Sequence, residues 1–195
     1  MTTPVVVIGI GNAYRRDDGV GLAVADDIAK RALPGIGVQS GIREPSALLD
    51  VWAGAELAIV VDATVTPIGE PGRVRRLTCD AVASAPTTSS HGLDVSQALE
   101  LGKALHRNPF RVVMYAIDVV DTGYGVGLTP AVAASVPGIA AAIVAEAEAA
   151  TGGDRLGETA LRHSPHRRPL SGNAGVVHAS ADPAQHPAGH QRGDG

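Results

Sequence analysis

The segment that most restricts the fold of this chain is its N-terminal run of branched apolar residues and the turn that follows. Val5–Ile10 consists almost entirely of Val and Ile, and it ends in the sequence Gly9-Ile10-Gly11-Asn12. A continuous apolar run of this kind predicts a strand buried on both faces, and the glycines predict a tight turn. After a polar loop, Val20–Leu33 repeats apolar residues at helical spacing until Pro34-Gly35. Strand, glycine turn and helix in this order are typical of the start of a doubly wound sheet.

The rest of the chain continues this alternation of strands and helices. The apolar run Leu57–Val61 is short enough for a central strand, and Gly72–Thr78, with arginines among its apolar residues, predicts an exposed edge strand that could run antiparallel. The other expected elements are strands at about Gly37–Ile42 and Arg111–Ile117 and helices at Ser46–Trp52, Leu93–Leu105 and Pro130–Ala150, the last with a Pro137-Gly138 step that could interrupt it. The pattern predicts an α/β fold, a three-layer α/β/α domain around a mostly parallel, twisted sheet.

The composition indicates one such domain followed by a tail. Hydrophobic residues make up 45% of the 195 residues but aromatic residues only 3%, so the core must consist of aliphatic side chains on closely packed elements. From Thr151 onward the chain is rich in small, charged and His residues, which bury too little apolar surface to offset chain entropy. We expect a folded domain over residues 1–150 and a disordered tail over 151–195. The tail holds five of the seven histidines, so it could bind metal weakly or have no defined role.

Charge, cysteine content and the N-terminus exclude several classes of protein. The net charge is -4, with both signs mixed along the folded part, so no basic surface for nucleic acid is expected. Cys79 is the only cysteine, which excludes an internal disulfide and fits a reducing compartment. The apolar run at the N-terminus is too short to span a membrane, and no basic leader or cleavage site accompanies it. We expect a cytoplasmic protein that binds neither membrane nor nucleic acid.

Three residues stand out as a candidate site: Asp18, Asp62 and His91. Each follows a predicted strand or directly precedes a predicted helix. In open parallel sheets the loops at the carboxyl ends of the strands line one crevice, so residues far apart in sequence can meet there. Two carboxylates and one imidazole would suit a borderline transition metal and leave open positions on it. A simpler interpretation exists, because an Asp after a strand commonly caps a helix and a His beside serines commonly forms loop hydrogen bonds.

Three segments resemble, in the same order, the motifs of the nickel-iron hydrogenase maturation peptidases. The first is VVVIGIGNAYRRDDGVG, in which a strand and a Gly-x-Gly-Asn turn lead to an acidic pair before a helix. The second is VVDATVTPIGEPG and the third is SSHGLDVSQALEL. Each motif alone is weak, but the ordered set is specific, and the similarity covers about residues 4–150. The resemblance implies a hydrogenase maturation peptidase domain over residues 1–150 with the family's phosphorylase/hydrolase-like three-layer fold.

The resemblance also implies an activity and a set of site residues. A protein of this family is an aspartic-type endopeptidase that removes the C-terminal extension of a nickel-loaded hydrogenase large-subunit precursor. The family's catalytic and metal-contacting trio corresponds here to Asp18, Asp62 and His91. Nickel would arrive with the precursor, although the isolated protein could hold another divalent metal. Asn12 would brace the turn after the first strand, and Asp17 would be a partner of the trio, a general base or, as we favour, a helix cap.

Other catalytic machinery is missing from the sequence. It contains no His-Glu-x-x-His of a zinc peptidase and no Gly-x-Ser-x-Gly elbow, and neither Ser89-Ser90 nor Cys79 has the surroundings of a catalytic nucleophile. Tyr14 stands where a dinucleotide-binding turn needs its third glycine. Two alternatives remain open. One is a maturation chaperone that binds metal through the trio without cutting, and the other is a nucleoside phosphorylase or hydrolase that would bind an anion through Arg15 and Arg16.

Overall fold

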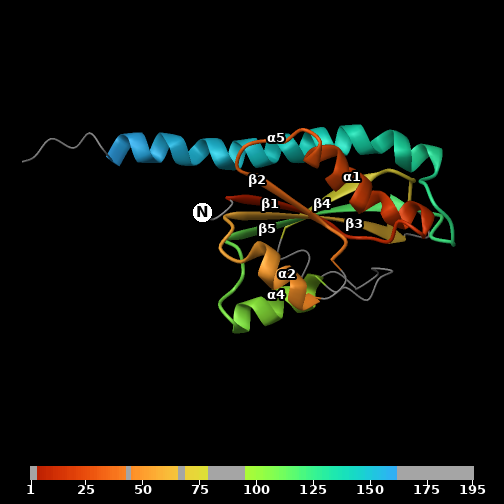
Figure 1. The fold of residues 1–195 in the computed structure, drawn as a ribbon, viewed down its shortest axis with the longest axis horizontal. Coiled ribbons are helices and arrows are strands. Elements are labelled where there is room, and N and C mark those ends of the chain that lie inside the picture. Colours follow the sequence, from red (N-terminus) through yellow and green to blue (C-terminus); the bar gives the residue numbers. More distant parts are fainter. Residues whose placement is uncertain (1–3, 43–44, 66–68, 79–94, 162–195) are drawn as a thin grey trace, which may run out of the picture. The chain divides into compact units, whose positions relative to one another are not determined.

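The computed structural model of the chain describes residues 4–42, 45–65, 69–78 and 95–161. Figure 1 labels the strands and the α-helices, and they follow the order that the sequence predicts. The strands are β1 (Val5–Gly9), β2 (Ile36–Ser40), β3 (Leu57–Val65), β4 (Val74–Thr78) and β5 (Arg111–Val119). The helices are the short 3-10 helix η1 (Arg16–Gly19) and the α-helices α1 (Val20–Ala29), α2 (Pro45–Trp52), α4 (Val95–Ala104) and α5 (Pro130–Leu161).

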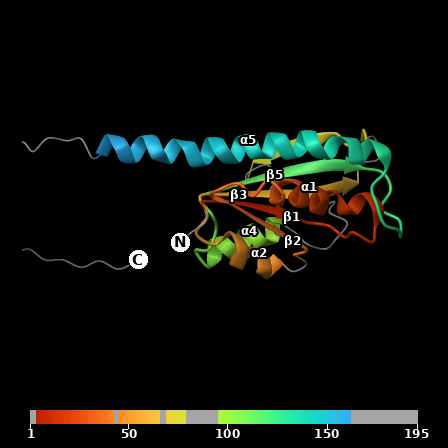
Figure 2. The same ribbon diagram turned by 45° about the horizontal axis from the view of Figure 1, so that its top comes forward.

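The five strands form one mixed sheet in the order β2-β1-β3-β5-β4. The strands β2, β1, β3 and β5 run parallel to one another, and β4 pairs antiparallel with β5 at the edge. Helices α1 and α5 cover one face of the sheet, and α2 and α4 cover the other (Figures 1 and 2). The predicted three-layer α/β/α architecture, the central position of β3 and the antiparallel edge strand are all confirmed.

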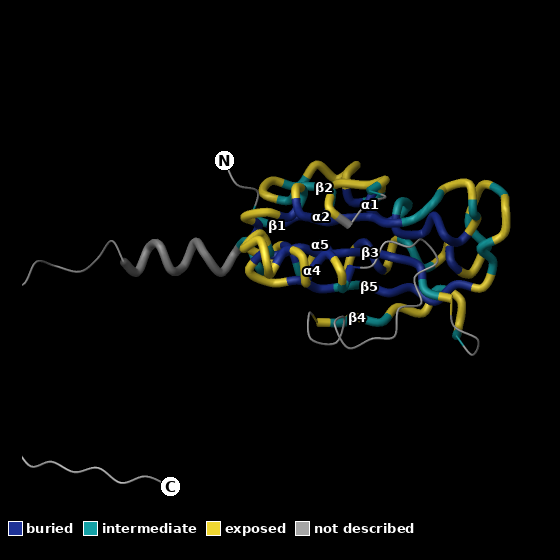
Figure 3. Tube along the Cα trace, turned by 90° about the horizontal axis from the view of Figure 1, so that it is seen from below, coloured by how far each residue is buried: buried dark blue, intermediate teal, exposed yellow. Residues whose placement is uncertain are grey.

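The core consists of two apolar clusters, one on each face of the sheet. Alternate residues of each inner strand point to opposite faces, so β3 contributes Leu57, Ile59 and Val61 to the cluster beneath α1 and α5, and Ala58 and Val60 to the cluster above α2 and α4. Burying each Val, Leu or Ile side chain contributes about 1.5–3 kcal/mol relative to exposure. Figure 3 shows the inner strands buried along their length and β4 largely at the surface, as its arginines predict.

Helix α5 differs from its prediction in two ways. It runs through Pro137 without ending there, because Pro137 and Gly138 lie on the exposed face, where water can bond the freed carbonyl. It also continues to Leu161, so residues 151–161, predicted to be part of a disordered tail, are helical. The prediction considered only the burial of apolar surface, whereas the extension of an existing helix needs no new nucleation and gains one hydrogen bond per added residue. The remainder of the predicted tail, 162–195, lies outside the described residues.

Helix α1 is shorter than the sequence predicts. It ends at Ala29 rather than at Leu33, because Ala32 adopts a left-handed backbone (φ 47°) that no α-helix can include.

In the described part of the chain one helical segment, Pro130–Thr151, is long and apolar enough to cross a membrane by length and composition. Three residues of this segment, Ile139, Ile143 and Ala147, are buried in the apolar cluster between the sheet and helices α1 and α5, as expected for a core helix.

Candidate active site

The candidate site lies where β1 leaves the sheet. Gly9, the last residue of β1, pairs with Val61 of β3, whereas β3 continues beside β5 as far as Val65. Asp62 is therefore the first residue of β3 that has lost its β1 neighbour. The chain passes from β1 outward to β2 and then back across to β3, so this is a point where the strand order reverses, the usual place for ligand sites in such sheets.

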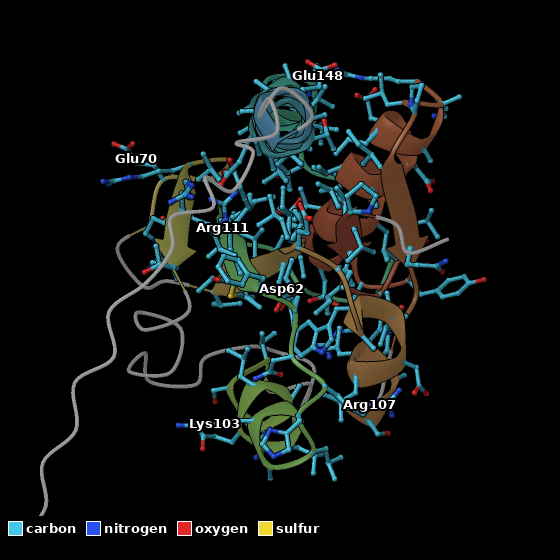
Figure 4. All side chains as sticks on the ribbon, turned by 90° about the vertical axis from the view of Figure 1, so that its left-hand side faces the viewer. Asp62, Glu70, Lys103, Arg107, Arg111 and Glu148 are labelled. Atoms are coloured by element: carbon cyan, nitrogen blue, oxygen red, sulfur yellow. The ribbon has the colours of Figure 1, made fainter. Side chains whose placement is uncertain are left out.

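Asp62 is fully buried at this point, and its position corrects one expectation. We predicted that Asp62 follows the strand, but pairing with β5 extends β3 beyond it, and Asp62 pairs with Ala116. Its Oδ1 accepts a hydrogen bond from the Ala63 amide at 2.8 Å. Because Ala58 and Val60 face the α2/α4 layer, the alternation of the strand turns the Asp62 side chain to that layer as well. Figure 4 shows Asp62 near the centre of the domain.

Asp18 reaches the same end of the sheet from the loop after β1. It lies in η1, is fully buried, and its helix packs against β3. Its amide donates to the Arg15 carbonyl at 3.1 Å, and its own carbonyl accepts from the Asn12 amide at 3.3 Å. Gly11 has a φ of 145°, and a Cβ there would collide with the Asp18 carbonyl, so only glycine permits this close turn. The sheet topology thus places Asp18 beyond the carboxyl end of β1 and against β3, the neighbouring strand that contains Asp62.

Asn12 has the role that its position predicts. Its Oδ1 accepts from the Tyr14 amide at 3.0 Å, and its carbonyl accepts from the Arg15 amide at 2.9 Å. These bonds brace the turn between β1 and η1 that carries Asp18. The prediction that Asn12 supports this turn is confirmed.

The favoured role of Asp17 as a helix cap is wrong. Neither η1 nor α1 has a side-chain cap hydrogen bond. Asp17 is instead fully buried and accepts three hydrogen bonds from the loop between β5 and α5: from the Thr129 amide at 2.6 Å, the Thr129 hydroxyl at 3.0 Å and the Asp121 amide at 3.3 Å. A partner more than 100 residues away cannot be read from local sequence. Asp17 therefore ties the loop that carries Asp18 to the start of α5.

Sequence reasoning missed the loop of residues 120–129. It follows β5, so the rule that loops at carboxyl strand ends line the crevice could have indicated it. Arg16 forms an ion pair with Asp121 (2.7 Å), and the Arg15 Nε donates to the Thr122 carbonyl at 3.1 Å. Both arginines that an anion-binding enzyme would have used thus hold this loop.

His91 lies outside the described residues, so the predicted trio is not tested as a whole. Within the described ranges, no group of three or more His, Cys, Asp and Glu side chains could hold a metal ion. The donors available there are the carboxylates of Asp18 and Asp62, and oxygen ligands alone suit hard cations better than nickel. Helix α4, which starts at Val95, belongs to the layer that Asp62 faces.

The shifted pKa values belong to another part of the molecule. Arg76 of β4 forms a two-point ion pair with Glu146 of α5 (2.6 and 2.9 Å), and the Tyr115 hydroxyl of β5 donates to the same carboxylate at 2.8 Å. The Arg76 hydrogen bonds lower the pKa of Glu146, and Glu146 raises the pKa of Arg76. Burial, with the bond to Glu146, raises the pKa of Tyr115 to about 12. This cluster joins β4, β5 and α5, and Tyr115 belongs to the face of the sheet that α1 and α5 cover, opposite to the face to which Asp62 points.

Comparisons with known proteins agree with this architecture. Among solved structures, the chain is similar to the hydrogenase maturating endopeptidase HybD from E. coli, with a TM-score of 0.66, 20% identity and coverage of 73% of this chain and 90% of that one. It is similar to the nickel-iron hydrogenase maturation protease HybD from Thermococcus kodakarensis, with a TM-score of 0.61, 21% identity and coverage of 73% and 98%. An endopeptidase from E. coli solved in solution matches with a TM-score of 0.66, 23% identity and coverage of 72% and 90%. No curated protein matches.

The family assignment comes from the sequence profile rather than from these structures, whose low identity shows the shared fold. The profile described as hydrogenase maturation protease matches residues 40–146, which is more than half of the chain. The matched region runs from the end of β2 through β3 and β5 into α5, and it includes Asp62. The chain belongs to the hydrogenase maturation protease family and is, as a member of it, an endopeptidase of hydrogenase maturation.

Proposed function

We propose that this protein removes the C-terminal extension of a hydrogenase large-subunit precursor, and that it recognises the precursor through the nickel ion already inserted there. The observation that carries the proposal is the placement of two fully buried carboxylates, Asp18 and Asp62, at the strand-order reversal of a maturation-protease domain. Buried acids are costly unless their surroundings compensate the charge, so a fold that holds two of them at its ligand-binding end supports a functional role.

His91 completes the proposed site. An imidazole nitrogen beside two carboxylate oxygens would form a donor set that suits nickel better than the carboxylates alone. Asp18, Asp62 and His91 would contact the nickel of the precursor, which is part of the substrate rather than a resident cofactor. The isolated protein could hold another divalent cation with the same groups.

The buried carboxylates have a second use in the proposed reaction. Peptide hydrolysis needs a water molecule that loses a proton as it attacks the carbonyl carbon, and an ionised carboxylate within hydrogen-bond reach can accept that proton. Bound nickel would supply a Lewis acid near the carbonyl oxygen. This division of labour corresponds to an aspartic-type endopeptidase acting in the cytoplasm, where the precursor is assembled.

The test is direct incubation of the purified protein with a nickel-loaded large-subunit precursor that retains its extension. Loss of the C-terminal peptide, followed by mass spectrometry, is the expected result, and the same precursor without nickel should remain intact. A precursor that binds the protein but is never cut would favour the alternative function, a metal-binding maturation chaperone. Cleavage that does not depend on nickel would leave the peptidase assignment standing and remove the proposed mode of recognition.

A further inference from the structure

Two loops beside the candidate site expose large apolar side chains. Tyr14, in the loop after β1, is 70% exposed, and Tyr124 and Val126, in the loop after β5, are 92% and 81% exposed. Single exposed apolar residues are ordinary on a protein surface, but several on adjoining loops at a ligand-binding end are typical of a contact surface. We call Tyr14, Tyr124 and Val126 the aromatic platform.

The two loops are fastened to each other through their backbones. The Gly125 amide donates to the Tyr14 carbonyl at 2.9 Å, and the Arg16 amide donates to the Gly125 carbonyl at 3.1 Å. Arg16 adds side-chain bonds to the Asp121 carboxylate (2.7 Å) and to the Tyr124 carbonyl (3.3 Å). The platform residues therefore sit on a connected pair of loops, even though more than 100 residues separate Arg16 from Tyr124 in sequence.

These bonds also decide what the platform can bind. The charge of Arg16 is balanced by Asp121, and the loop carbonyls of Tyr14 and Gly125 already accept hydrogen bonds. The exposed side chains that these loops offer a partner include two phenol rings and a Val side chain. An adjoining shallow cavity of about 470 Å³ is lined by Arg16 and residues 125–130. The exposed surface of this cavity is mainly polar, so the two loops together offer apolar side chains and hydrogen-bonding groups. This combination fits a polypeptide segment better than a small charged metabolite.

Continuity with the candidate site identifies the segment. Tyr14 and Asp18 belong to the same short connection between β1 and α1, and Asp17 bonds both Asp121 and Thr129 of the second loop. We infer that the aromatic platform is the docking surface for the precursor polypeptide next to the bond that is cut, an inference that rests on the proposed function. Because both loops are already held in place, docking loses little conformational entropy.

The inference is tested with the double variant Tyr14→Ser/Tyr124→Ser, assayed for cleavage of a nickel-loaded large-subunit precursor. The expected result is a KM raised roughly tenfold or more, as for loss of aromatic contact residues, with kcat and the melting temperature nearly unchanged. The double variant Tyr14→Phe/Tyr124→Phe should restore the wild-type KM. The matched control is Phe110→Ser, because Phe110 is 95% exposed at the start of β5, at the opposite end of the sheet.

Each other outcome overturns the inference in a recognisable way. An unchanged KM in the Ser double variant, with normal cleavage by the wild type, removes the docking role and leaves the proposed function intact. An equal rise in KM for Phe110→Ser would show a general surface effect instead. A wild-type protein that sediments as a dimer, and becomes monomeric in the Ser double variant, would assign the platform to self-association. Failure of the wild type to cut any precursor would remove the proposed function and this inference together.

Discussion

Asp17 and Glu146 are both acids held by several hydrogen bonds, but the donors around them differ in kind. Asp17 is fully buried, and two of its three donors are backbone amides of the loop between β5 and α5. Glu146 lies nearer the surface and is held by side chains alone, the Arg76 guanidinium and the Tyr115 hydroxyl. Backbone donors fix the position of a loop, whereas long side chains join elements that the sheet and its helix already hold together.

This difference indicates that the region around Asp17 positions the side chains of the candidate site, whereas the region around Glu146 contributes to stability. The bonds of Asp17 connect η1, and so Asp18, to the loop that carries Tyr124. The bonds of Glu146 connect α5 to β4 and β5, elements that pack together independently of the candidate site. Changes around Asp17 and Asp62 should therefore alter processing, and changes around Glu146 should alter only stability.

The largest effect is expected for His91→Ala. If His91 supplies the imidazole ligand of the proposed trio, its removal leaves two carboxylates that bind nickel poorly, and no cleavage should be detectable. The free energy of unfolding should change by about 0.5 kcal/mol or less, as for a surface substitution. Cleavage and thermal melting are measured on one preparation. Normal cleavage would make His91 an ordinary loop residue and remove the imidazole from the site.

The next largest effect is expected for Asp62→Asn. The amide keeps the shape of the side chain, and its Oδ1 can still accept the hydrogen bond from Ala63, so the fold should persist. It cannot accept a proton or ligate a metal as a carboxylate does, and kcat should fall by roughly a hundredfold to ten-thousandfold. Glu146→Gln is the matched control, because it makes the same chemical change outside the site. A variant Asp62→Asn with wild-type kcat would place the chemistry elsewhere.

A smaller, mixed effect is expected for Asp17→Ala. The substitution leaves the part-buried amides of Thr129 and Asp121 without their acceptor, which should lower the free energy of unfolding by about 1–3 kcal/mol. Release of the loop should also raise KM, because Asp18 and the aromatic platform lose their common anchor. Hydrogen exchange of the residue 120–129 amides reports on the loop directly. Unchanged exchange there, despite lost stability, would contradict the proposed link.

The smallest effect is expected for Glu146→Gln, and it depends on pH. The pKa of Glu146 is lowered from 4.5 in the folded protein, so its contribution to stability is complete above about pH 4.5 and is lost as the pH falls through the lower, folded-state value. The partly exposed ion pair with Arg76 should contribute about 1 kcal/mol or less at neutral pH. Melting temperatures between pH 3 and pH 7 should fall less steeply in the variant, and identical slopes would show that Glu146 does not cause the acid dependence.

The elements of this fold follow from local patterns, while their exact ends do not. The branched run of β1 and the apolar run of β3 are buried strands, as their composition predicts. Pairing with β5 extends β3 past Asp62, and α5 continues past Ala150 as an extension of the helix that precedes it. The first extension depends on a strand that is distant in sequence, and the second on the helix that already precedes the added residues, so the composition of the added residues alone predicts neither.

The candidate site shows the same division. Asp18 and Asp62 could be selected from the sequence because each stands near the carboxyl end of a strand, and Asn12 because it follows the glycine turn. The role of Asp17 could not, since all three of its donors come from a loop more than 100 residues away. His91, which the sequence also selects, lies outside the described residues and stays a prediction.

The sequence by itself determined the three-layer α/β class, the apolar strands of the sheet and the acids at its ligand-binding end, because hydrophobic period and turn residues are local properties. Only the tertiary structure decided that the loops after β1 and β5 are joined, with the amide of Gly125 bonded to the carbonyl of Tyr14. The bond depends on where β1, β3 and β5 place their carboxyl ends in space. Without it, Tyr14 and Tyr124 are two exposed residues with no relation in the sequence.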